Sequence, residues 1–132
     1  MKRPIRVLVA NPLKLMREVL IAAFADQQDI EVVGEVSEEA DIPARVQETR
    51  PDFVFIGLDD PDVRPALCDV VLRARPEVDI IAVGAHSNRS VRYWASNTIH
   101  SSRMESSEEA ILAVMRRKAS VGRETSCKGQ LN

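Results

Sequence analysis

Few of the residue types that build specialised sites occur in this sequence. Its 132 residues include two cysteines, two histidines and five glycines. Cys68 and Cys127 lie far apart, so we expect no disulfide framework and a reducing, cytoplasmic compartment. Two histidines and two scattered cysteines do not provide the spacing of a zinc site. The lone glycines at 34, 57 and 84 form no phosphate-cradling GxGxxG loop, which argues against a nucleotide site.

The sequence also lacks a long apolar run and a strong charge of either sign. No apolar run approaches the ~20 residues that a membrane-spanning helix needs. The 20 acidic and 18 basic residues leave a net charge of −2. This balance creates no field that would draw nucleic acid or an anionic membrane to the chain. We therefore expect this domain to bind neither of them directly.

Residues 1–118 have the length and periodicity of one domain with its own core. Apolar residues make up 45% of the chain and charged residues 29%, as is usual for globular proteins. Residues 119–132 are polar and aperiodic, so we expect a flexible C-terminal tail there. No internal repeat is present.

Short apolar runs alternate with helical patterns along the chain. The predicted strands are 5–10, 30–36, 52–56, 78–83 and 97–101. The predicted helices are 12–26, 41–50, 62–75, 88–96 and 106–118. Strands that alternate with helices predict an α/β fold in which helices cover both faces of a parallel sheet. The functional loops of such a sheet follow the carboxyl ends of its strands.

The stretch FVFIGLDDPD, residues 53–62, has the pattern of a buried strand that runs into an acidic loop. Its first four residues are apolar without alternation, which is typical of a strand covered on both faces. Asp59 and Asp60 follow the strand. They are either a carboxylate site or two solvated carboxylates in a turn before Pro61, and the second reading is favoured.

The chain resembles the response-regulator receiver domain of two-component signalling, and most closely receivers that precede helix-turn-helix DNA-binding domains. The resemblance covers residues 5 to about 118. It rests on the order and spacing of IRVLVANPLKLMREVL, DIEVVGEV, RPDFVFIGLDDP, RPEVDIIAVGAH and SSEEAILAV. It implies a flavodoxin-like (βα)5 doubly wound fold with a five-stranded parallel sheet and a site at the strands' carboxyl ends.

The resemblance also implies which positions would perform phosphoryl chemistry. Receivers hold Mg²⁺ with an acidic pair after the first strand, and here that pair falls on Asn11 and Pro12. The phosphoacceptor aspartate falls on Gly57, in register with Pro61 four residues later. Glycine has no nucleophile, and proline has no side-chain ligand. We therefore expect no cofactor, with the Mg²⁺ site lost.

Three further positions of the receiver pattern have also changed. The hydroxyl that bonds the phosphoryl oxygens falls on Gly84, and the charge-balancing lysine falls on Arg103. The aromatic switch residue falls on His100, for which a partly buried, hydrogen-bonded histidine is the alternative to a pH switch. Asp59 or Asp60 remains as a displaced acceptor, although either would require the loop before Pro61 to rearrange.

Arg92, Tyr93 and Trp94 lie in the predicted fourth helix, on the face that receivers commonly use for partners. Aromatic residues and arginine are favoured at interface hot spots, while core packing of one ring is the alternative.

These residues predict a receiver-like module that is not an enzyme. We expect phosphorylation-independent signalling through a protein partner, which is a signalling protein, an effector domain or a histidine kinase, or through a homodimer. The alternative is an active phosphoacceptor that uses Asp59 and has a transcription-regulatory output.

Overall fold

The computed structural model describes residues 3–60, 62–84 and 89–128. The strands are β1 Ile5–Val9, β2 Ile30–Glu35, β3 Phe53–Leu58, β4 Asp79–Gly84, β5 Arg89–Ser96 and β6 Thr98–Glu105. The helices are α1 Lys14–Ala25, α2 Ile42–Thr49, α3 Ala66–Ala74 and α4 Glu108–Lys128, with a short 3-10 helix at Glu39–Asp41.

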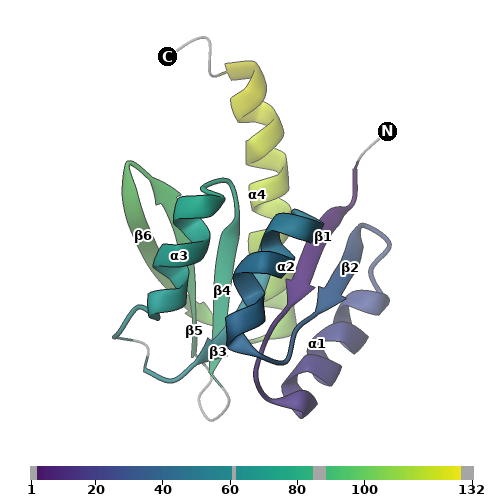
Figure 1. Ribbon diagram of the computed structural model, residues 1–132. Helices are drawn as coiled ribbons and strands as arrows, with labels where there is room; N and C mark the ends of the chain where they lie inside the picture. The colour runs from purple at the N-terminus through teal and green to yellow at the C-terminus, as the bar shows by residue number, and fades with distance from the viewer. Residues whose placement is uncertain (1–2, 61, 85–88, 129–132) are drawn as a thin grey trace.

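The strands form one six-stranded sheet in the order β2-β1-β3-β4-β5-β6 (Figure 1). β1 to β4 are parallel, whereas β5 is antiparallel to β4, and β6 is antiparallel to β5. The predicted fold class is confirmed, because helices flank a mostly parallel central sheet of the flavodoxin-like kind. The prediction of a five-stranded, fully parallel sheet is wrong in its last part. Four parallel strands are followed by an antiparallel hairpin of two strands.

The helix predicted at 88–96 is wrong, because the described part of that segment is strand β5. From residue 91 to residue 94 the burial alternates: Val91 and Tyr93 are buried, while Arg92 and Trp94 are half-buried. This period of two suits a strand, and the open edge of β4 supplies the pairing partner. Asn97 makes the turn into β6 with a φ of 46°, a conformation that asparagine tolerates better than most residues.

The last helix is longer than predicted. We expected it to end near Lys118, but α4 continues to Lys128. Ile111, Leu112 and Met115 of this helix belong to the described core. The division of the chain at residue 118 into a domain and a tail stays a prediction.

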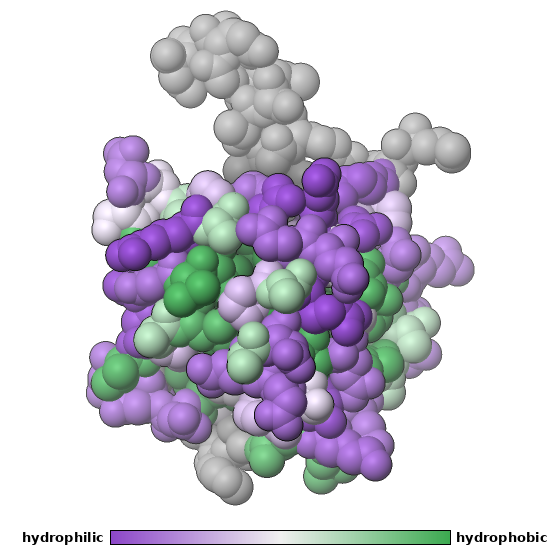
Figure 2. Space-filling model, in the orientation of Figure 1, coloured by the Kyte–Doolittle hydropathy of each residue, from purple (hydrophilic) through white to green (hydrophobic). Residues whose placement is uncertain are grey.

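Two apolar layers hold the helices on the sheet. The layer on the α2 and α3 side contains Val54, Ile56, Val71 and Tyr93. The layer on the α1 and α4 side is built around Phe24 and Phe55, whose ring centroids are 5.1 Å apart. β3 contributes to both layers, as its uninterrupted apolar run predicts. In Figure 2 the molecule presents a mostly hydrophilic surface on which apolar residues gather over α3.

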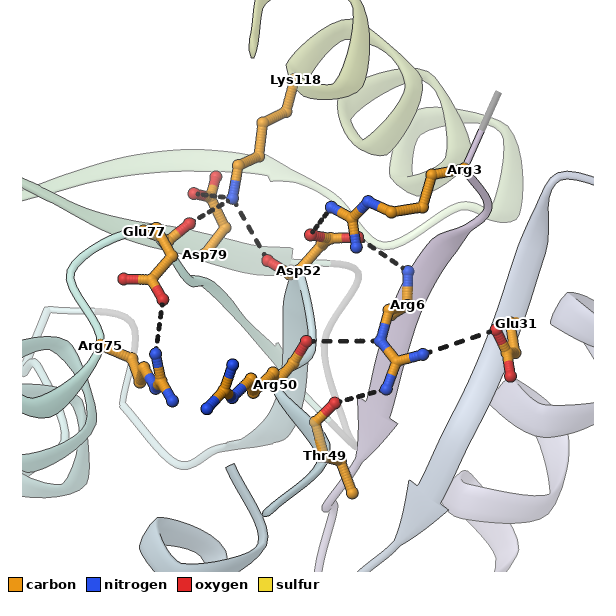
Figure 3. Close-up of polar contacts among 10 residues, drawn as sticks. All are labelled: Arg3, Arg6, Glu31, Thr49, Arg50, Asp52, Arg75, Glu77, Asp79 and Lys118. Carbon is orange, nitrogen blue, oxygen red and sulfur yellow. Dashed lines mark hydrogen bonds and ion pairs between the residues drawn. The ribbon is translucent and has the colours of Figure 1, made fainter. Parts of the chain in front are cut away.

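Paired charges close the edge of the sheet where β3 and β4 begin (Figure 3). The carboxylate of Asp79, only 5% exposed, pairs with Arg92 and lies 2.9 Å from the ammonium of Lys118 on α4. Lys118 also donates hydrogen bonds to the carbonyl oxygens of Asp52 and Glu77, at 3.2 and 2.8 Å. One lysine therefore ties α4 to the amino ends of two neighbouring strands.

Candidate functional site: the carboxyl edge of the sheet

The candidate site lies at the opposite edge, where β1, β3 and β4 end. Asn11 and Pro12 follow β1, and the backbone N–H of Ala10 donates to the carbonyl of Phe55 on β3 at 2.7 Å. Gly57 lies within β3, beside Val83. Gly84 ends β4 beside Leu58 and has no hydroxyl to offer. The parallel strands thus bring the predicted positions 11, 12, 57 and 84 to one edge of the sheet.

Asn11 uses both ends of its amide on nearby backbone. The residue is 1% exposed. Its Nδ2 donates to the carbonyl of Ile56 at 3.4 Å, and its Oδ1 accepts from the N–H of Leu13 at 3.0 Å. The second bond closes an Asx turn in the loop just before α1. The side-chain oxygen that Asn11 could offer to a cation is therefore already hydrogen-bonded to the backbone.

Arg17 holds the loop between β1 and α1, a role that sequence reasoning missed. Its guanidinium donates to the carbonyl oxygens of Asn11 and Pro12 at 2.9 and 3.1 Å, and to the carboxylate of Glu35 at 2.7 Å. The residue is only 8% exposed, although it lies on a helix. An arginine one turn into the helix after the first strand was the available signal, because its fork can bond several loop carbonyls at once.

Pro12 packs against the backbone of Gly57. A Cβ placed on Gly57 would lie 2.9 Å from Cδ and 3.2 Å from Cγ of Pro12, and 3.7 Å from Nδ2 of Asn11. The first distance is shorter than a carbon–carbon contact allows. The proline ring therefore takes part of the space that a side chain at position 57 would need. The two changes from the receiver pattern fit each other sterically.

A cavity of about 190 Å³ opens beside this contact, between β1, β3 and the loops that follow β2 and β3. Its lining includes the buried apolar residues Ile42, Ile56 and Leu67 and the exposed acidic residues Glu39, Asp59 and Asp60. It is the natural place for a small group to approach the sheet edge.

Asp59 and Asp60 are both exposed. The carboxylate of Asp60 accepts from the backbone N–H of Asp62 at 2.9 Å, a local turn contact. Pro61, on which the register argument rested, lies outside the described residues. Within the described ranges, no group of three or more His, Cys, Asp and Glu side chains is arranged to hold a metal ion.

Arg103 lies on β6 and forms an ion pair with Asp62. The pair is exposed, with 54% of the arginine side chain and 72% of the aspartate side chain accessible. The positive charge predicted at position 103 is therefore present. It is neutralised by Asp62 and not by either of the acceptor candidates, Asp59 and Asp60.

The predicted interface residues Arg92, Tyr93 and Trp94 lie on strand β5 rather than on a helix, and the predicted switch residue His100 lies on strand β6, as expected for the last strand. His100 is exposed and stacks on Trp94, directly opposite it in the ladder, with ring centroids 5.4 Å apart. The guanidinium of Arg92 lies 4.5 Å from the centre of the Trp94 ring on the same face. Tyr93 points into the other layer and is 2% exposed, so core packing describes this ring.

Burial also determines the chemistry of the described cysteine. Cys68 on α3 is fully buried, and this burial raises the pKa of its thiol to about 12, with the carboxylate of Asp69 adding to the shift. Such a thiol stays protonated and is a poor nucleophile. None of the described helices has the length and apolar character required to cross a membrane.

Comparison with curated proteins finds two partial relatives, while no family model matches the chain. The chain is 30% identical over 89 residues to a protein-glutamate methylesterase/protein-glutamine glutaminase of Koribacter versatilis, covering 67% of this chain and 24% of that protein. It is 28% identical over 85 residues to the uncharacterized transcriptional regulatory protein YhcZ of Bacillus subtilis, covering 64% of this chain and 40% of that protein. The chain thus spans less than half the length of either relative.

Solved structures with a similar fold are receiver domains of regulators. The response regulator domain of Thermotoga maritima CheB is 25% identical with a TM-score of 0.55, over 63% of this chain and 62% of that one. The receiver domain of a NarL regulator from Mycobacterium tuberculosis is 22% identical with a TM-score of 0.55, over 65% and 70% of the two chains. A LuxR-family response regulator from Aurantimonas, 17% identical, also has a TM-score of 0.55, over 64% and 61%.

The strand order β2-β1-β3-β4, the helices on both faces and these similarities agree with one another. The resemblance that the sequence indicated is confirmed: this chain has the fold of response-regulator receiver domains and is similar in sequence to members of that family.

Proposed function

We propose that this domain is a receiver-like signalling module that works without phosphorylation, by binding a protein partner or a second copy of itself. It is not an enzyme in this proposal, and it uses no Mg²⁺. The observation that carries the proposal is the contact between Pro12 and Gly57 at the carboxyl edge of the sheet.

The first support is the absence of a nucleophile where phosphoryl transfer would occur. Transfer to a receiver requires a carboxylate held in place and cations that neutralise the developing charge. Gly57 has no side chain, and Pro12 lies where one would begin. Position 57 therefore has no group that can attack phosphorus. A side chain introduced there would collide with the proline unless the loop shifted.

The second support is the donor set that a divalent cation would meet. Mg²⁺ prefers several anionic or carbonyl oxygens in an octahedral arrangement. The side-chain oxygen of Asn11 is bonded to Leu13, and the carbonyl oxygens of Asn11 and Pro12 accept from Arg17. These residues do not fit Mg²⁺, because the positively charged guanidinium of Arg17 already binds the carbonyl oxygens that the ion would need and would repel it.

Exposed apolar side chains support a protein as the ligand. Leu15 and Val19 on α1 are 72% and 56% exposed, and Val70 on α3 is 52% exposed. Leu15 and Val19 lie four residues apart on one face of α1, so together they form an exposed apolar spot that is available to a protein partner. A signalling protein, an effector domain and a histidine kinase are the partner classes that match the receiver fold.

Intact-mass spectrometry after incubation with acetyl phosphate and Mg²⁺ tests the proposal. We expect no gain of a phosphoryl group. The alternative is a displaced acceptor at Asp59, which lines the cavity and is exposed. A mass gain of one phosphoryl group that disappears in Asp59→Ala but persists in the matched variant Asp60→Ala would overturn the proposal in favour of that alternative.

A further inference from the structure

Strand β6 leaves a long backbone edge without a partner among the described residues. It runs from Thr98 to Glu105 and pairs with β5 along its whole length, with no shift of register. In Figure 1 no described helix or strand lies beyond its outer side. Such an edge presents a row of free N–H and C=O groups that another strand can use.

The other edge strand of the sheet, β2, has a feature that discourages pairing with a further strand, whereas β6 has none. The register between β1 and edge strand β2 shifts between Val7 and Leu8, an irregularity of the kind that discourages further pairing. β6 contains no such irregularity, and its sequence TIHSSRME contains neither proline nor lysine, the residues that commonly block an edge. All side chains of β6 except Ile99 and Met104 are exposed.

We infer that β6 pairs antiparallel with β6 of a second copy of this chain, so that two sheets join into one. This inference deepens the proposed function, because it names the second copy as a partner. The twofold axis of such a pair stands perpendicular to the sheet. It keeps the two α3 sides on one face, so each residue faces a residue that points to the same side.

The charges of β6 limit the registers that are favourable. Its ionised side chains are Arg103 and Glu105, so the strand is electrically neutral and meets its own copy without net repulsion. Pairing centred on Arg103 would place two guanidiniums opposite each other, which is unfavourable. Pairing centred on Met104 would shorten the shared ladder and bring the acidic first turns of the two α4 helices together.

Pairing centred on Ser101 avoids both problems. It sets residues 98–104 of one copy against 104–98 of the other, with Ser101 facing its own counterpart. The aliphatic part of Arg103 then lies against Ile99 of the second copy, while its guanidinium remains with Asp62. Among the described contacts of β6, none has to break for the second strand to approach.

Sedimentation velocity across a concentration series tests the inference. We expect reversible dimers between about 10 µM and 1 mM, because a contact through one strand pair is small. Ser101→Lys places two like charges face to face and should abolish the dimer. The matched variant Ser96→Lys puts the same charge on an exposed residue at the end of β5 and should not abolish it. Circular dichroism confirms that both variants are folded.

Cysteine cross-linking provides a second, independent measurement. In a Cys127→Ser background, Ser101→Cys should form a disulfide-linked dimer on mild oxidation, and Ser102→Cys should do so much more slowly, because it faces residue 100 of the other copy. Cys68 is buried and does not compete. A wild-type chain that stays monomeric, equal loss of the dimer in both lysine variants, or equal cross-linking at 101 and 102 would overturn the inference. None of these outcomes would change the expected absence of phosphorylation, which the mass experiment decides separately.

Discussion

The ring of Pro12, in the loop that follows β1, lies against the backbone of Gly57 in β3, although α1, β2 and α2 separate the two residues in the sequence. A Cβ on Gly57 would be 2.9 Å from Cδ of Pro12. The contact links the loss of the metal-binding position to the loss of the phosphoacceptor position, because a side chain at 57 and a proline at 12 compete for the same space.

This competition predicts a specific coupling in stability. Gly57 does not have a positive φ, so alanine fits its backbone, and only the contact with Pro12 opposes the substitution. Gly57→Ala should lower the free energy of unfolding by about 1–3 kcal/mol, as overpacking usually does. The double variant Pro12→Ala/Gly57→Ala should lose clearly less than the sum of the two single variants. Urea unfolding of all four proteins measures this coupling, and simple additivity would mean that the ring moves aside freely.

The same site should not respond to Mg²⁺. Trp94 fluorescence and amide chemical shifts are the readouts, and the expected result is a flat titration into the millimolar range, since Asn11 and Pro12 supply no free anionic oxygen. The triple variant Asn11→Asp/Pro12→Asp/Gly57→Asp, which restores the receiver carboxylates, is the matched control. A saturable shift of the wild-type amides near 11 and 57 would contradict the proposed loss of the metal site.

The ion pair of Arg103 and Asp62 should contribute little to stability. Both side chains are more than half exposed, and exposed pairs are typically worth about 0–1 kcal/mol. Arg103→Ala and Asp62→Ala should each leave the melting temperature almost unchanged in a calorimetric scan. A large loss in either variant would show that this loop is held by more than the ion pair.

Asp79 should behave in the opposite way. Its carboxylate is 5% exposed and lies between Arg92 and Lys118. Asp79→Ala leaves two cations without their buried partner, and removal of one member of a buried ion pair typically costs about 3–5 kcal/mol. Chemical denaturation of Asp79→Ala beside Asp62→Ala compares a buried and an exposed aspartate in one protein. Equal, small losses would mean that water reaches Asp79 in solution.

The buried thiol of Cys68 predicts a reactivity and a pH dependence. Its pKa is raised from 9.0 to about 12 by burial. The folded state therefore holds the proton more tightly than the unfolded state does. The associated stability is complete below about pH 9 and falls as the pH rises towards 12. In a Cys127→Ser background, a thiol reagent at pH 8 should label Cys68 only after denaturant is added. Rapid labelling of the native protein would show that α3 opens readily.

Much of the architecture follows from local patterns that need no tertiary information. The apolar runs at 5–10, 52–56 and 78–83 predict β1, β3 and β4 in the right places, because a strand buried on both faces is apolar almost throughout. The partial alternation at 30–36 predicts β2, an edge strand that is only partly buried. The side-chain chemistry at positions 11, 12, 57 and 84 is likewise a matter of residue identity. No fold can supply a carboxylate where the chain has glycine.

The segment 89–105 shows where local information ends. The alternation of Val91 and Tyr93 with Arg92 and Trp94 is compatible with a strand, but the sequence pattern of this short segment was interpreted as a helix. A strand needs a partner, and the open edge of β4 exists only once the sheet has formed. Tertiary contacts also decide that Lys118 neutralises Asp79 and that Pro12 fills the space over Gly57, while the path of the loop after β1 decides that Oδ1 of Asn11 accepts from Leu13. These contacts join residues that are distant in the sequence or depend on the path of a loop, so periodicity and propensity carry no record of them.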